Sequence, residues 1–198
     1  MTLKSKNRQK EIFAKSARLF RKKGYAATSI RDIAEAVGMK SASLYNHIES
    51  KQEILQALLL PIAKIYVKSI DRVNETTLPA IEKLEQIIRD QIRITMENPD
   101  AVSLVPDQWV FLENDPKKAI LAYDEYVNLR NHYEKIFIQI FQRAIDEEDL
   151  KPVHINIACF SILSTLRRLY SWYARHRSID QKVLEEELIV NLLGGLRR

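Results

Sequence analysis

The sequence predicts an all-α protein of about nine helices. Three observations support this fold class. Apolar residues recur at intervals of three and four along most of the chain, which is the spacing of one helix face. The 198 residues include only 4 Gly and 6 Pro, whereas an all-β protein needs a turn about every 8–12 residues. With 46% hydrophobic and 29% charged residues, the chain has enough apolar side chains for a core, which excludes a disordered or collagen-like protein.

The first fifty residues predict three helices. An amphipathic helix covers residues 5–23 and ends at Gly24, where a C-capping glycine belongs. A second helix begins at the capping box Ser29-Ile30-Arg31-Asp32 and stops at Gly38. A third is expected over Ser41–Ile48, after a short turn that the glycine opens. The inward apolar residues are Ile12, Phe13, Ala17 and Phe20 in the first helix, Ile30, Ile33, Ala34 and Val37 in the second, and Leu44 and Ile48 in the third.

Longer helices are expected in the rest of the chain. Ser50 caps a helix in which Pro61 predicts a kink. Residues 101–113 are apolar but ambiguous, and Asp115-Pro116 then opens a helix with proline at its first position. The penultimate helix is apolar nearly all round, so it must be buried on more than one side. These expected helices cover residues 50–73, 78–97, 115–147, 153–175 and 180–196.

Positive charge is concentrated near the N-terminus. Residues 1–50 hold 11 Lys/Arg and 4 Asp/Glu, a net charge of +7, whereas residues 51–198 hold 20 and 22, a net charge of −2. Such a basic segment suits a polyanion, and charge alone leaves nucleic acid and an anionic membrane surface both open. The N-terminus lacks the apolar run of a secretory signal, and the uncharged stretch 155–166 is too short to span a bilayer.

The sequence lacks the motifs of an enzyme or a metal site. A single cysteine allows no internal disulfide, which suits a reducing compartment, and we expect a cytoplasmic protein. Cys159 lies in an apolar run typical of a core residue. The histidines have no metal-ligand spacing with it or with one another, and no glycine-rich loop precedes a helix. We therefore predict no catalysis, no cofactor and no bound metal. The histidines are His47, His132, His154 and His176.

Residues 8–55 carry a family resemblance. The matching features are Phe20, Gly24-Tyr25, Thr28–Ala34, Val37-Gly38, Leu44–His47 and Ser50–Glu53. With these features the segment strongly resembles the N-terminal DNA-binding domain of TetR/AcrR-type transcription regulators, with Ile48 where the family often has phenylalanine. The resemblance implies a helix-turn-helix DNA-binding domain over residues 1–51 and a helical regulatory and dimerisation domain over residues 52–198.

The resemblance assigns the third helix to the major groove of DNA. Small side chains at its start let the backbone approach the bases, Asn46 suits adenine, and Ala42 suits a thymine methyl group. Tyr45 and His47 match the family's phosphate-contacting pair, and Lys51 matches its phosphate clamp. The expected DNA-binding residues are Thr28, Ser29, Lys40, Ser41, Ala42, Ser43, Tyr45, Asn46, His47 and Lys51.

In this family the second domain dimerises and often binds a small molecule. The helices over 153–175 and 180–196 are the expected homodimer interface, and two recognition helices about 34–36 Å apart suit a palindromic operator in double-stranded DNA. The resemblance implies a transcription regulator, a repressor released by a small apolar or amphipathic ligand. Members with a pair like Trp172-Tyr173 suggest an acyl-CoA effector by analogy. The expected ligand-binding residues are Trp109, Phe111, Tyr126, Tyr133, Phe137 and, as the anchor for an anionic group, Arg167.

Alternative interpretations remain open at this point. Aromatic residues at helical spacing also suit a plain core, and Arg167 also suits a salt bridge with an acidic residue. The basic first helix also suits a protein that binds a membrane surface or protein partners without specific DNA recognition. A DNA affinity that falls steeply with salt separates the operator-binding interpretation from these.

Overall fold

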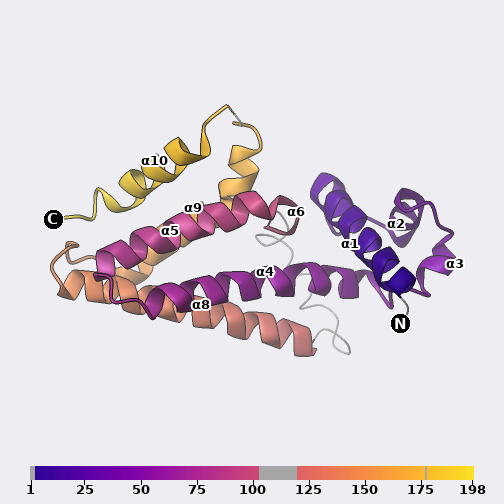
Figure 1. Ribbon diagram of the computed structural model, residues 1–198, viewed down its shortest axis with the longest axis horizontal. Helices are drawn as coiled ribbons and strands as arrows, with labels where there is room; N and C mark the ends of the chain where they lie inside the picture. Colours follow the sequence, from indigo (N-terminus) through magenta and orange to yellow (C-terminus); the bar gives the residue numbers. More distant parts are fainter. Residues whose placement is uncertain (1–2, 103–119, 177) are drawn as a thin grey trace. The chain divides into compact units, whose positions relative to one another are not determined.

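The structure is a computed structural model that describes residues 3–102, 120–176 and 178–198. Within these ranges the regular structure is α-helical, apart from one isolated bridge between Leu150 and Arg197 (Figure 1). The predicted all-α class is confirmed. The chain forms two compact units, Met1–Ile62 with Asp100–Tyr126 and Ala63–Pro99 with Val127–Arg198, so far as those ranges are described.

Besides residues 100–102 and 120–126, the first unit includes three helices and the first half of a fourth. They are α1 (Leu3–Lys23), α2 (Ile30–Ala36), α3 (Ser41–Leu44) and the N-terminal half of α4 (Lys51–Asn74). Gly24 and Gly38 both have positive φ, +84° and +66°, which glycine adopts without the steric cost that a Cβ brings, and they end α1 and α2 as predicted. The buried core consists of Ile12, Phe20, Tyr25, Ile33, Ala34, Val37, Leu44, Ile48, Ile54, Leu55 and Leu59.

Helix α3 is shorter than the sequence predicts. We expected a helix over Ser41–Ile48, but the α-helix ends at Leu44. The amides of Asn46 and His47 donate to the carbonyls three residues earlier, at 3.3 and 2.9 Å, so the chain tightens into a 3₁₀-like turn. Ile48 still reaches the core at 2% exposure, so the inward face is the predicted one.

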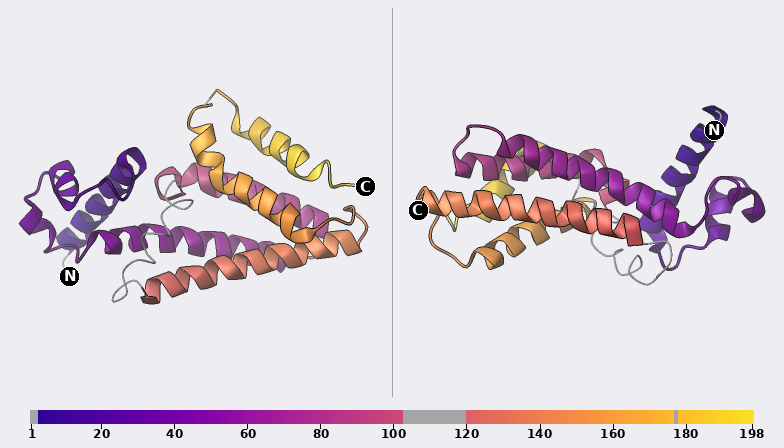
Figure 2. Two further views of the ribbon diagram at one scale, coloured as in Figure 1. Left: turned by 180° about the vertical axis from the view of Figure 1, so that it is seen from behind. Right: turned by 90° about the horizontal axis from the view of Figure 1, so that it is seen from below.

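The second unit contains most of the remaining helical residues. It holds the second half of α4 together with α5 (Ala80–Glu97), most of α8 (Ile120–Asp146), α9 (Ile155–Tyr173) and α10 (Gln181–Leu193). The short α6 (Pro99–Val102) follows α5. Helix α5 packs against both α9 and α10, and α4 runs beside α8 in both views (Figure 2). Much of the predicted ambiguous stretch, and the predicted start of the helix at residue 115, lie outside the described residues.

Helix α4 is continuous through Pro61. Ser50 caps it as predicted, because the amide of Glu53 donates to the Ser50 hydroxyl at 3.1 Å. Pro61 is exposed and lies one residue before the boundary between the two units, which falls between Ile62 and Ala63. The kink at Pro61 stays a prediction.

The core of the second unit includes polar side chains. The Tyr133 hydroxyl donates to the Gln91 side-chain oxygen at 2.7 Å, and the Tyr66 hydroxyl lies 3.1 Å from that of Thr95. Desolvation raises the pKa of Tyr66 to about 12 and that of Tyr133 further still. Burying such groups is tolerated because each has a hydrogen-bond partner.

Candidate nucleic-acid interface

The helix-turn-helix core fixes which side of α3 faces outward. Leu44 is fully buried, whereas the adjacent Tyr45 is 56% exposed. Lys40, Ala42 and Asn46 are exposed as well. The predicted interface residues Ser41, Ser43 and His47 are half-buried. Because α3 packs on α2 through its apolar side, its exposed side is presented as one surface.

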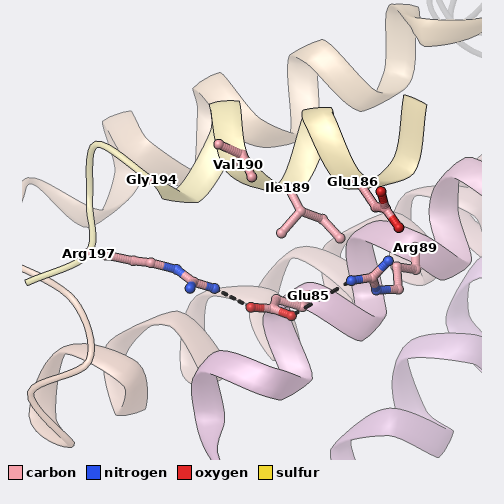
Figure 3. A pocket seen from close by; sticks show the side chains of 7 residues that line it. All are labelled: Glu85, Arg89, Glu186, Ile189, Val190, Gly194 and Arg197. Atoms are coloured by element: carbon pink, nitrogen blue, oxygen red, sulfur yellow. Dashed lines mark hydrogen bonds and ion pairs between the residues drawn. The ribbon is translucent and has the colours of Figure 1, made fainter. Parts of the chain in front are cut away.

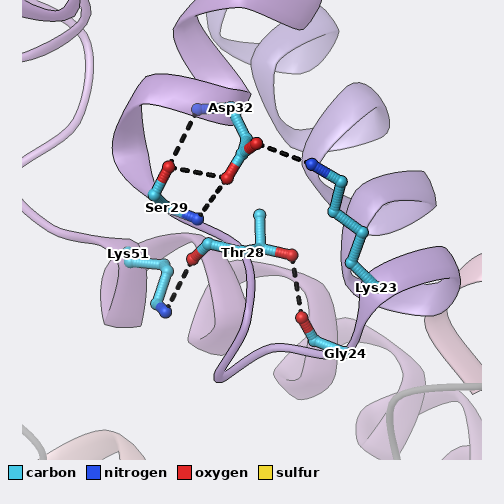
Figure 4. A network of polar contacts seen from close by, with 6 residues as sticks. All are labelled: Lys23, Gly24, Thr28, Ser29, Asp32 and Lys51. Carbon is cyan, nitrogen blue, oxygen red and sulfur yellow. Dashed lines mark hydrogen bonds and ion pairs between the residues drawn. The ribbon is translucent and has the colours of Figure 1, made fainter.

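A capping network holds the start of α2 (Figure 4). The Ser29 hydroxyl accepts from the Asp32 amide at 3.1 Å, and the Asp32 carboxylate accepts from the Ser29 amide at 2.8 Å and from its hydroxyl at 2.6 Å. The predicted capping box is therefore confirmed. The Lys23 ammonium donates to the same carboxylate at 2.6 Å, and together with Ser29 it holds the pKa of Asp32 well below its usual range.

The predicted backbone-contacting residues beside this cap are engaged within the protein. Thr28 is buried at 1% exposure, and its hydroxyl donates to the Gly24 carbonyl at 2.8 Å. The Lys51 ammonium donates to the carbonyls of Tyr25 and Thr28, each at 2.8 Å. Thr28, Ser29 and Lys51 thus lie together at the start of α2. The hydroxyl and ammonium groups of their side chains already donate hydrogen bonds to acceptors within the protein.

Two polar contacts from α1 were not predicted from the sequence. The Arg8 guanidinium donates to the Val37 carbonyl at 2.8 Å, at the end of α2, and also pairs with Glu11. The Gln9 side-chain amide donates to the His47 carbonyl at 3.2 Å, just after α3. Both contacts satisfy carbonyls at helix ends. A polar side chain on the outer face of a helix gives no sequence signal for such a long-range partner, and the positive charge of residues 1–50 had suggested only contact with a polyanion.

His47, which follows α3, is half-buried. Its Nδ1 atom is buried without a hydrogen-bond partner among the described residues. A buried N–H without an acceptor is costly, so the tautomer that carries its proton on Nε2 is favoured. In this tautomer Nε2–H is the hydrogen-bond donor of the ring.

The residues predicted to bind a ligand differ in their burial and in their polar partners. Tyr126, Tyr133 and Phe137 are buried at 7%, 9% and 0% exposure. The Arg167 guanidinium is paired with Glu134 across α8 and α9, as the alternative salt-bridge interpretation proposed. Trp109 and Phe111 lie outside the described residues.

The second unit also has surface clefts. One of about 330 Å³ lies between α5 and α10, and its charged groups are largely satisfied by one another, because Glu85 pairs with Arg197 and lies 4.0 Å from Arg89 (Figure 3). Another of about 620 Å³ runs between α9 and α10. Across the described ranges, no group of His, Cys, Asp and Glu side chains is arranged to hold a metal ion, and no helix is long and apolar enough to cross a bilayer.

Both the N-terminal part and the C-terminal part of the chain match known protein families. Residues 12–58 match the bacterial regulatory proteins of the tetR family, and residues 77–196 match the tetracyclin repressor-like C-terminal domain. The chain belongs to the TetR family. The helix-turn-helix described above is therefore the DNA-binding part of a TetR-family transcription regulator, as the sequence predicted.

Individual relatives of this TetR-family chain cover almost its whole length. The transcriptional repressor KstR2 of Mycobacterium tuberculosis is 24% identical over 195 residues, which are 97% of this chain and 94% of KstR2. The solved structure of that ketosteroid regulator gives a TM-score of 0.85 over 96% of this chain and 95% of the other, at 21% identity. PfmR of Thermus thermophilus gives 0.75 at 26% identity, with 94% and 99% covered. AibR, solved with isovaleryl coenzyme A and operator DNA, gives 0.73 at 21% identity, with 92% and 96% covered.

Proposed function

We propose that this TetR-family regulator is a homodimeric repressor that reads a palindromic operator with α3 and releases it when a small apolar or amphipathic molecule binds. The observation that carries the DNA-binding part is the division of α3 into two sides. Its apolar side is anchored by Leu44 and Ile48, and its exposed side presents Ala42, Tyr45 and Asn46. A helix held in this way offers a fixed set of side chains to the major groove.

The exposed side chains suit distinct roles on DNA. Asn46 carries the donor and acceptor that pair with adenine, and Ala42 is small enough to meet a thymine methyl group. Tyr45, the Nε2–H of His47 and the Lys40 ammonium are donors for phosphate oxygens. Ser41 and Ser43 have small side chains, so the backbone at the start of α3 can approach the bases. Thr28 and Ser29 shape the start of α2 beside this surface, since their hydroxyls are already bonded within the protein.

The second copy of the chain covers the outer face of α9 and α10. Both helices expose large apolar side chains that a lone chain leaves in water: Ile157 (63%), Phe160 (70%), Trp172 (41%), Val183 (49%) and Val190 (64%). Several large exposed apolar side chains on two helices favour an interaction surface. The 620 Å³ cleft between α9 and α10 gives a partner helix room to insert side chains. These observations support the homodimer through the two C-terminal helices.

Three of the proposed effector residues, Tyr133, Phe137 and Arg167, lie in the second unit. Tyr133 and Phe137 lie in its apolar core, and Gln91 and Thr95 supply buried polar groups nearby. An apolar pocket with a few polar anchors suits a small amphipathic molecule. The complex of AibR with isovaleryl coenzyme A supports an acyl-CoA as one candidate class. Trp109, Phe111, Tyr126 and Arg167 stay in the proposed set. Release follows if the effector binds the operator-competent form less tightly than the other form.

The test is selection of bound fragments from genomic DNA, followed by affinity measurements over a salt series. We expect a palindromic site whose half-sites lie about one helical turn apart, and an affinity that falls steeply as salt rises. A panel of acyl-CoA esters added to the isolated complex then tests effector-driven release. Binding without sequence preference would contradict the operator proposal and direct attention to anionic membranes and protein partners.

A further inference from the structure

A protruding side chain on α9 lies beside an open cleft. Phe160 is 70% exposed, the largest exposed fraction among the large apolar side chains of the described residues. The cleft of about 620 Å³ between α9 and α10 is lined by Ile157 and Ser161, which lie three residues before and one residue after Phe160. Its other lining residues include Ala158 and Gly195, whose small size leaves it open. A lone chain therefore leaves both a bulky apolar side chain and a cleft in water on neighbouring turns of one helix.

The cleft suits an apolar side chain. Ile157, Ile162 and Leu192 supply apolar walls. Its two hydroxyl groups are already bonded within α9, because Ser161 and Thr165 each donate to the carbonyl four residues earlier at 2.9 Å. An apolar group that enters leaves neither hydroxyl without a partner. One water takes up about 30 Å³, so the cleft has room for a large side chain.

The charges of the two helices are opposite. Helix α9 carries only Arg167 and Arg168, whereas α10 carries Lys182 and the acidic run Glu185–Glu187, a net charge of −2. Arg167 also pairs with Glu134 on α8. Two copies of α10 repel each other, whereas α9 of one copy attracts α10 of another. Charges of this kind fix the orientation of partners more than their affinity. They favour a two-fold pair in which α9 of each copy faces α10 of the other.

We infer that two copies join by reciprocal insertion: Phe160 of each copy enters the α9–α10 cleft of the other. The inference rests on the proposed homodimer and names the contact by which the chain selects a second copy of itself. Two-fold symmetry makes every contact occur twice, so one protruding residue and one cleft on the same helix are enough to close the dimer. A helical chain that lacks either feature leaves the other unfilled, which makes the pairing specific.

Exchanging the volumes of the two features tests the insertion. Phe160→Ala should raise the dissociation constant of the dimer about 100-fold, because an apolar side chain is lost from both contacts. Ser161→Trp fills the cleft from within its own chain and should weaken the dimer by a similar factor. In the double variant the indole no longer blocks a phenyl ring. Its dimer should therefore be at least tenfold tighter than the product of the two single effects predicts.

Sedimentation velocity over a dilution series measures these constants. Both positions are exposed in the single chain, so the substitutions leave its core intact, and circular dichroism checks that the helical content is unchanged. Gln139→Trp is the matched control for an added indole, because Gln139 is exposed on α8 and does not line the α9–α10 cleft. This control should have the dissociation constant of the unmodified chain.

Three results would overturn the insertion. If the effects of Phe160→Ala and Ser161→Trp simply multiply, the side chain and the cleft do not meet across the interface. If Ser161→Trp dimerises as tightly as the unmodified chain, the cleft lies outside the interface. Both of these results leave the homodimer standing. An unmodified chain that sediments as a monomer at every concentration overturns the homodimer together with the insertion, so the two failures are distinguishable.

Discussion

Asn46 is exposed to solvent and carries the two hydrogen-bonding groups that match the major-groove edge of adenine. Replacing it by alanine removes the proposed base-reading contact and leaves the proposed phosphate contacts in place. We expect Asn46→Ala to weaken binding to the selected operator by about 1–3 kcal/mol and to relax the preference at one base position per half-site.

The measurement for Asn46 is binding to a set of operators changed at single positions. The preference at every other position should stay as in the unmodified protein, and so should the salt slope. A uniform loss over all operators would instead assign Asn46 to the sugar–phosphate backbone.

We expect the Asp32 carboxyl to make the stability of the first unit depend on pH. Lys23 and Ser29 hold the pKa of its carboxyl well below the ordinary value of 3.8. A carboxyl whose pKa is lowered by folding stabilises the folded state above its unfolded pKa, and that stabilisation is lost as the pH falls toward the folded pKa. We expect Asp32→Asn to lower the Tm of the first unit at pH 7, by an amount that shrinks steadily below about pH 4.

Thermal unfolding over a pH series checks this expectation. Asp124→Asn is the control, since Asp124 is an exposed aspartate on α8, and it should leave the Tm unchanged at each pH. An equally large loss for Asp32→Asn at pH 2.5 and at pH 7 would show that the carboxylate charge is not what stabilises the cap.

At the scale of helices, a buried carboxylate ties α4 to α5. Asp90 is 3% exposed, and its two oxygens accept from four side chains at 2.6–2.9 Å: Ser69 and Arg72 on α4, and Gln86 and Arg93 on α5. Removing the carboxylate loses these bonds and leaves the Ser69 and Gln86 groups to find new partners. Both arginines are largely exposed and can turn to water.

We therefore expect Asp90→Ala to lower the free energy of unfolding by about 2–4 kcal/mol. Urea titration followed by circular dichroism measures the change. Glu97→Ala is the control, because Glu97 is an exposed acid on the same helix and should cost about 0.5 kcal/mol or less. A cost for Asp90→Ala as small as that of the control would mean that the four donors are equally well satisfied by water.

The helices themselves were largely predictable, and the polar contacts between them were not. Periodicity and capping residues placed α2 and its capping box closely, because these signals act over a few residues. The same signals overextended α3, where the choice between i→i−4 and i→i−3 hydrogen bonds depends on how Ile48 meets the core. The partners of Asp90 could not be predicted, because they lie on two helices and up to 21 residues away along the chain.

The candidate interface was likewise predictable in its helix residues and not in its polar contacts. The residues of α3 were identified from the family resemblance, and the structure exposes Tyr45 and Asn46 as an outward surface requires. That Lys51 turns inward to the carbonyls of Tyr25 and Thr28 was not predictable. Spacing along the chain places a lysine in the first turn of a helix, but it does not reveal which acceptor the long side chain reaches.

At the scale of the whole molecule, the proposed operator recognition requires two copies of the chain acting together. The proposed interface centres on Phe160, which is 70% exposed in the single chain. Burying a carboxylate there without a partner is costly, so Phe160→Glu should give a folded monomer. Each monomer then binds one half-site alone, and the operator affinity should fall by about 10²–10⁴-fold, because the second half-site no longer binds at a high effective concentration.

Sedimentation equilibrium and operator titration test this prediction together. Phe160→Leu keeps an apolar side chain and should remain dimeric with nearly unchanged operator affinity. Ile65→Glu is the matched control for a charge placed at an exposed apolar position, because Ile65 is 42% exposed and lies on a different helix, α4. This variant should also remain dimeric. If Phe160→Glu stays dimeric, the second copy docks on another face. If it is monomeric but binds the full operator as tightly as before, recognition does not require the dimer.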